Sequence, residues 1–244
     1  MTQEYSKYTE EDHQVWSILY TEQIKNLPAI ATRAYLEGIE KCGFVAERVP
    51  DFNEVNEALS EATGWQIYVV PGLIDNKPFF EHLSRKEFPA TTWLRSMEQL
   101  KYLEEPDMFH DTFGHIPLLS EQFFCDYLQG LSQIILDYID YPIAVEMMAR
   151  LYWYTVEFGL IKEQDELKIY GAGILSSSGE SIFSVSSEAN HVPFDPSVIL
   201  NTPYIKDKFQ SQYFVIDSYE QLFRCLPTVR TLIEEAVRHT SKAA

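Results

Sequence analysis

The chain has 244 residues, 45% of them hydrophobic and 14% aromatic, which suits one globular domain with a large core. A formal net charge of −18 repels phosphate backbones and anionic lipid, so we expect no nucleic-acid partner and no membrane partner. With three widely spaced cysteines, no secretory signal and no membrane-spanning apolar run, we expect a cytoplasmic protein without disulfides.

Apolar spacing and turn residues predict a mostly α protein of the α+β kind, with many helices and a few short strands. In chain order we predict a helical region over 11–41 broken at Pro28, a helix over 51–62, a strand over 65–70, helices over 79–87, 106–114, 120–138 and 142–163, strands over 181–186 and 213–216, and helices over 218–226 and 228–240. A capping box at Asp51 to Glu54 opens the second helix, and Pro227 separates the last two. The regular strand–helix alternation of a doubly wound sheet is missing.

Two histidines lie close together in the run Glu105-Pro-Asp-Met-Phe-His-Asp-Thr-Phe-Gly-His-Ile-Pro117. His110 and His115 are five residues apart, which is about 140° around an ideal α-helix, so they do not share a face. They can converge only where the backbone leaves regular geometry. We expect Gly114 and Pro117 to supply such a helix end.

Glu157 lies in Tyr152-Trp-Tyr-Thr-Val-Glu-Phe-Gly159, on a predicted helix face that is otherwise apolar and aromatic. A carboxylate in such surroundings costs several kcal/mol unless it is paired or bound to a metal. Two imidazoles and one carboxylate are the ligands of a mononuclear non-haem Fe(II) site that leaves one face of the metal open. The competing interpretation is that both histidines are structural and Glu157 pairs with Arg150.

Three longer motifs carry a resemblance: the run 105–117, the run 152–159, and Tyr170-Gly-Ala-Gly-Ile-Leu-Ser-Ser177. On these motifs the chain resembles the pterin-dependent aromatic amino acid hydroxylases, most closely the bacterial phenylalanine-hydroxylating members. The similarity runs from about residue 16 to residue 238. It implies one catalytic domain over 1–244, without a regulatory or tetramerisation segment, and therefore a monomer.

The resemblance also implies roles for individual residues. His110, His115 and Glu157 would ligate Fe(II) and form the catalytic centre. The residues that would contact a tetrahydropterin co-substrate are Gly72, Leu73, Ile74, Phe79, Asp111 and Tyr152. Those that would bind or enclose the amino-acid substrate are Arg95, Leu103, Pro106, Trp153, Gly173, Ser176 and Ser177. Arg95 would hold the substrate carboxylate, although by itself its spacing suggests a surface pair with Glu98.

Two positions bear on the substrate. Trp153 is similar to phenylalanine and tyrosine hydroxylases, since tryptophan hydroxylases have Phe there, and Lys206 stands where tyrosine hydroxylases carry an acidic residue. Leu103 departs from the threonine of animal members, which leaves the contacts to the substrate's ammonium and carboxylate open.

The resemblance therefore implies a monooxygenase that converts L-phenylalanine, tetrahydropterin and O2 to L-tyrosine and 4a-hydroxypterin, with a pterin-recycling enzyme acting downstream. The alternatives are hydroxylation of tryptophan or tyrosine, a metal-binding protein without catalysis, and a zinc hydrolase. The last is disfavoured because no glutamate lies between the histidines as in His-Glu-x-x-His.

Overall fold

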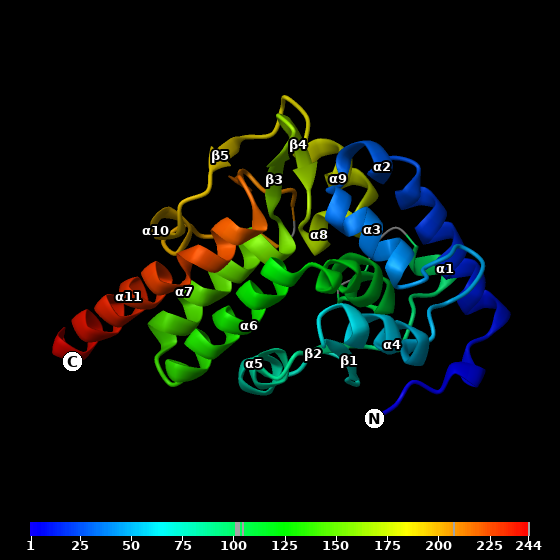
Figure 1. Cartoon of the computed structure of the whole chain (residues 1–244), viewed down its shortest axis with the longest axis horizontal. Coiled ribbons are helices and arrows are strands. Elements are labelled where there is room, and N and C mark those ends of the chain that lie inside the picture. Colours follow the sequence, from blue (N-terminus) through cyan, green and yellow to red (C-terminus); the bar gives the residue numbers. More distant parts are fainter. Residues whose placement is uncertain (101–102, 104, 207, 244) are drawn as a thin grey trace.

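The structure is a computed structural model that describes residues 1–100, 103, 105–206 and 208–243, and it is mainly helical (Figure 1). The α-helices are α1 (Glu10–Ile24), α2 (Leu27–Ile30), α3 (Arg33–Lys41), α4 (Phe52–Ala62), α5 (Asn76–Ser84), α6 (Gln122–Asp137), α7 (Pro142–Tyr152), α8 (Ala172–Leu175), α9 (Ser178–Ser184), α10 (Pro196–Ile199) and α11 (Tyr219–Ala243). The other helical turns are the 3₁₀ turns η1 (Tyr5–Lys7), η2 (Met97–Gln99) and η4 (Ile116–Ser120) and the π-helices η3 (Phe109–His115) and η5 (Trp153–Glu157).

The strands form two small sheets. β1 (Gln66–Val69) pairs in parallel with β2 (Glu87–Ala90). The second sheet has the order β4-β3-β6-β5, with strands β3 (Leu160–Glu163), β4 (Glu166–Ile169), β5 (His191–Pro193) and β6 (Tyr213–Ile216). β3 and β4 form a hairpin whose two turn residues, Gln164 and Asp165, both have positive φ, as a tight primed turn requires.

One apolar core joins the helices to both sheets. Helices α6, α7 and α11 run side by side along one flank, while α5 and the β1–β2 pair lie below the centre of the molecule (Figure 1). Near the centre, Phe109 and Phe113 stack at 4.7 Å, and Trp16 packs edge-on against Phe109. Within the described residues, every helix is too short or too polar to cross a membrane.

In the first half of the chain most predicted elements are confirmed, and two details are wrong. The predicted capping box is absent, because Asp51 accepts from the backbone and side-chain nitrogens of Asn53, and Glu54 pairs with Arg48. The helix predicted over 79–87 ends at Ser84, and residues 87–90 form β2. A proline at position 89 is compatible with β2 because that strand lies at a sheet edge.

In the second half three predictions are wrong. The helix predicted over 142–163 ends at residue 157, because the apolar residues that follow also fit a strand and pair with β4 and β6. Residues 181–186 are mostly α9 and not a strand, since the Ser177 side chain caps this helix by accepting from Glu180 N. Pro227 lies inside α11 even though a proline there removes one helical hydrogen bond, and next to it Leu226 packs closely against Gly130 of α6.

Candidate metal centre

The two histidines converge on one π-helix. In this winding the hydrogen bonds close between residues five apart, so residues i and i+5 lie one turn apart on the same side. That is the spacing of His110 and His115 in η3. The predicted cause, a helix end, is therefore wrong. Pro117 does not stop the run but lies in the first turn of η4, which continues it.

Glu157 reaches the histidines from the second π-helix, where Phe158 N bonds to Trp153 O at 2.8 Å. Its Oε1 lies 3.3 Å from His115 Nε2, and its Oε2 lies 3.7 Å from His110 Nε2. The two Nε2 atoms are 3.3 Å apart, and the three side chains offer ligand atoms within 4.8 Å of one another. The alternative partner for Glu157 is excluded, because Arg150 pairs with Glu146.

Ser176 fixes the tautomer of His110. Its Oγ donates its only proton to the Ala172 carbonyl at 2.8 Å, so in the 2.9 Å contact with His110 Nδ1 the oxygen must accept. Nδ1 therefore carries the ring proton, and His110 Nε2 turns an unprotonated lone pair toward Glu157 and His115. This is the arrangement that a metal-binding histidine needs.

Glycines let α8 approach both π-helices. A Cβ at Gly114 would lie 2.9 Å from the backbone carbonyl oxygen of Ala172, and a Cβ at Gly171 would lie 2.4 Å from the backbone carbonyl oxygen of Glu157. Gly173 lies next to Glu157 as well, and its backbone forms a hydrogen bond with the side-chain carboxylate of Glu157. The run Gly-Ala-Gly thus brings Ser176 within reach of His110.

The charge balance favours deprotonated ligands. Burial raises the pKa of Glu157, but the charges of His115 and His110 and the Gly173 hydrogen bond outweigh it, so the Glu157 pKa is lowered. Burial lowers the pKa of His110, and Glu157 opposes this only partly. Both groups are then ready to bind a cation near neutral pH, because ligands must lose their protons first. Two imidazole nitrogens and a carboxylate fit a non-haem Fe(II) ion.

Three of the six residues predicted to contact a pterin lie beside this centre: Asp111, Phe79 and Tyr152. Asp111 follows His110 directly and accepts from Thr91 N at 2.8 Å, and burial raises its pKa although His110 opposes this. The rings of Phe79 and Tyr152 meet edge to face at 5.9 Å, and burial raises the pKa of Tyr152 well above its usual value. The remaining predicted pterin residues lie between β1 and α5: Gly72, Leu73 and Ile74.

Arg95 has a partner that the sequence analysis missed. The carboxylate of Asp107, which is fully buried, accepts from Arg95 Nε at 2.8 Å and from Nη2 at 2.9 Å. Its Oδ1 also accepts from His110 N at 3.2 Å. The expected pair with Glu98 is absent from the described contacts of Arg95. An acidic residue inside the motif, three positions before His110, was the signal available. The pairing aims a rigid guanidinium and ties it to the metal-ligand helix.

The other predicted substrate residues fall into two groups. Trp153 begins η5, and its ring stacks on Tyr204 at 4.5 Å and packs on Phe158 at 4.7 Å. A spacing of four is close to one turn of a π-helix, so Trp153 and Glu157 lie on the same side of η5. The others are half-buried, and of these Gly173 contacts Glu157 and Ser176 contacts His110: Leu103, Pro106, Gly173, Ser176 and Ser177.

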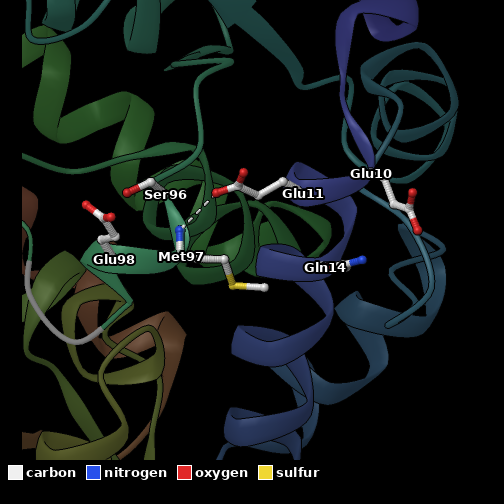
Figure 2. Close-up of a pocket in the computed structure, with 6 residues that line it drawn as sticks. All are labelled: Glu10, Glu11, Gln14, Ser96, Met97 and Glu98. Atoms are coloured by element: carbon white, nitrogen blue, oxygen red, sulfur yellow. Dashed lines mark hydrogen bonds between the residues drawn. The ribbon is translucent and has the colours of Figure 1, made fainter.

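A separate hollow lies between α1 and η2. Figure 2 shows its lining: Glu10, Glu11, Gln14, Ser96, Met97 and Glu98. Glu11 accepts from Met97 N at 3.3 Å. The lining is acidic or neutral, and no ligand of the candidate metal centre belongs to it.

Comparison with known proteins identifies the family. The model of the biopterin-dependent aromatic amino acid hydroxylases matches residues 4–238. The chain belongs to this family. A curated relative, the phenylalanine-4-hydroxylase of Chromobacterium violaceum, is 51% identical over 229 residues, covering 91% of this chain and 75% of the relative. The phenylalanine-4-hydroxylase of Ralstonia nicotianae is 50% identical over 224 residues, covering 91% and 71%.

Solved structures support the fold of this aromatic amino acid hydroxylase. The phenylalanine hydroxylase of C. violaceum with bound oxidised Fe(III) superposes with a TM-score of 0.91 at 48% identity, covering 97% of this chain and 87% of that one. The cobalt-bound structure of the same enzyme gives the same TM-score and identity over 96% and 86%. The prediction of a mostly helical hydroxylase fold with few strands is confirmed, and the family to which the chain belongs is biopterin-dependent.

Proposed function

We propose that this protein is a phenylalanine 4-monooxygenase that converts L-phenylalanine, a tetrahydropterin and O2 to L-tyrosine and a 4a-hydroxypterin. The observation that carries the proposal is the cluster of His110, His115 and Glu157, with His110 oriented by Ser176. The relatives at about half identity are phenylalanine-4-hydroxylases, which supports phenylalanine over tryptophan or tyrosine. A tryptophan 5-hydroxylase from Xenopus laevis is more distant, at 36% identity over 219 residues.

In this proposal His110, His115 and Glu157 hold Fe(II), and the bound iron together with the reduced pterin supplies the redox chemistry with O2. The chain supplies position. Arg95, aimed by Asp107, binds the substrate carboxylate through its free N–H groups. Trp153 lines the side of the substrate ring, with Leu103, Pro106, Gly173 and Ser177 around it.

The pterin would lie against Phe79 and the backbone of Gly72, Leu73 and Ile74, near Tyr152 and Asp111. The edge-to-face contact of Phe79 with Tyr152 holds one ring in place for stacking. Burial raises the pKa of Tyr152, so its hydroxyl stays protonated and can donate a hydrogen bond. The 4a-hydroxypterin product requires a dehydrating and reducing enzyme to recycle it.

We further propose that residues 1–244 act as one catalytic domain, because one apolar core runs through the described residues. A monomeric state and a cytoplasmic location stay predictions.

The test is product analysis. Protein reconstituted anaerobically with Fe(II) is mixed with tetrahydropterin, O2 and one of phenylalanine, tryptophan or tyrosine, and products are separated by chromatography. We expect tyrosine from phenylalanine as the fastest reaction, and none from His115→Ala prepared in parallel. Preferred turnover of tryptophan would replace the proposed substrate, and pterin oxidation that is independent of any amino acid would refute the function.

A further inference from the structure

A buried carboxamide lies behind the indole of Trp153. Gln210 is 3% exposed, and its Oε1 accepts from Trp153 Nε1 at 3.0 Å. Its Nε2 donates to the Ile205 carbonyl at 2.8 Å. A carbonyl can only accept, so this second contact fixes which end of the carboxamide faces the indole.

The same carboxamide ties the indole to the segment that carries Tyr204, which we call the Tyr204 loop (residues 200–206 and 208–210). The Tyr204 ring stacks on Trp153 with an interplanar angle of 19°. Tyr154, the next residue of η5, donates to the Pro203 carbonyl at 2.7 Å. The loop and the first turn of η5 are therefore joined by a ring stack and by hydrogen bonds at both ends.

Gln210 is itself held from the other side. Its backbone N–H donates to Glu180 Oε1 at 3.1 Å, and the Tyr213 hydroxyl donates to the same oxygen at 2.7 Å. Glu180 is buried in α9, so the anchor belongs to the core and not to the loop. The chain of contacts runs from the core through Gln210 to the indole.

We propose that Gln210 is a positioning residue for substrate selection: it holds the Trp153 indole at one angle and makes that angle depend on the Tyr204 loop. The inference rests on the proposed function, which places Trp153 beside the substrate ring. A hydrogen bond to its N–H further restricts the rotation of the Trp153 indole about its two side-chain bonds, beyond what ring packing does. Fixing it sets the width of the space left for an aromatic substrate.

The variants separate the two ends of the carboxamide. Gln210→Met has a similar size but loses the hydrogen bonds that the carboxamide makes with Trp153, Ile205 and Lys208. Gln210→Glu keeps an oxygen for Trp153 Nε1 and loses the donor to Ile205. We expect Gln210→Met to raise KM for phenylalanine about fivefold, in line with the loss of one ordinary hydrogen bond, with a smaller change in kcat. We expect Gln210→Glu to fall between this variant and the wild type.

A spectroscopic readout is independent of turnover. The chain has four tryptophans, so the ¹⁵N-labelled protein gives few indole N–H signals, and Trp153→Phe assigns the one of interest. In Gln210→Met this signal should shift and exchange faster with solvent, while Gln210→Glu keeps it nearly in place. If Gln210→Met does not fold, Gln210→Asn, one methylene shorter, carries the same prediction.

Gln129→Met is the matched control, since its Nε2 also donates to a backbone carbonyl, that of Ser84, at 2.8 Å. It should leave the Trp153 signal and the KM unchanged. In the Trp153→Phe background, Gln210→Met should no longer alter KM. An equal effect in both backgrounds, or a wild-type KM and indole signal in Gln210→Met, overturns the inference. Failure of the proposed function shows in the wild type itself, which would then form no tyrosine.

Discussion

Two polar clusters lie at opposite ends of the short helix η5, and they are built differently. At its end, Glu157 and the two histidines turn lone pairs toward one another, and the contacts that orient them come from outside the cluster, as from Ser176. At its start, Trp153 meets Gln210 in a network where each donor faces an acceptor. The first cluster has a place for a cation and the second has none. Convergent acceptors indicate a ligand, whereas matched pairs indicate a shape that is held.

The largest effect should come from removing a member of the first cluster. His110→Ala, His115→Ala and Glu157→Ala are each expected to lose stoichiometric iron and tyrosine formation while the fold is kept, because the remaining two ligands hold iron too weakly. Metal analysis and circular dichroism measure the two properties. A variant with wild-type iron content and rate would show that the residue is not a ligand.

The next effect concerns the arginine that Asp107 aims. Arg95→Lys keeps the charge but loses the planar fork, so binding of the substrate carboxylate should weaken by about 1.5–3 kcal/mol. Steady-state kinetics should show this as a higher KM for phenylalanine and little change for the pterin. If the KM stays at the wild-type value, the carboxylate binds elsewhere, for example at backbone N–H groups near Leu103.

Ser176→Ala tests the tautomer argument. Without an acceptor at Nδ1, the His110 proton is free to move to Nε2, and iron affinity should fall by roughly 10–100-fold, as for other partners of metal ligands. Competition with a chelator measures the affinity. Ser184→Ala is the control, because the Oγ of Ser184, a buried residue of α9, likewise donates to a backbone carbonyl, that of Ser181. Equal iron affinity in the two variants would contradict the assignment.

Changes in the second cluster should have a smaller effect, and this effect should be on substrate selectivity. Trp153→Phe removes the width of one ring and should raise the tryptophan-to-phenylalanine ratio of kcat/KM, by roughly fivefold on the scale of small pocket changes. Rates are compared well below the melting temperature, since lost packing lowers stability. An unchanged ratio in a folded, iron-bound variant would move substrate choice to the region of Tyr204 and Lys206.

The smallest effect is a dependence on pH. Burial raises the pKa of Glu180, although Tyr213 and Gln210 oppose it. The folded state therefore holds this proton at a higher pH than the unfolded state, and the stability gained below the unfolded pKa is lost as pH rises through the folded pKa. Glu180→Gln keeps the acceptor oxygen but not the titration. As pH rises, the unfolding free energy of Glu180→Gln, measured with urea, should increase relative to that of the wild type. A difference that stays constant with pH would contradict this.

The sequence predicted the residues of the candidate site better than the course of the backbone that brings them together. Residue types and motifs were enough to predict that His110, His115 and Glu157 come together, and apolar spacing was enough to predict most of the helices around them. Spacing could not predict the π-helices. The interval of five residues between His110 and His115 is interpreted by α-helical geometry unless the fold is known. Leu160 and Ile161 fit a strand as well as a helix, and only pairing with β4 and β6 decides between them. Gln210 contacts Trp153, 57 residues away, and no local pattern reveals that pairing.

The π-winding at His110 and Glu157 also limits how this chain can change in length. Loops between elements accept inserted or deleted residues at little cost, because their ends stay where the core holds them. Within Phe109–His115 a single deletion would favour α-helical winding and rotate the residues after it relative to those before it, which would change how His115 faces Glu157. Variation by insertion or deletion is therefore confined to the segments outside the two π-helices.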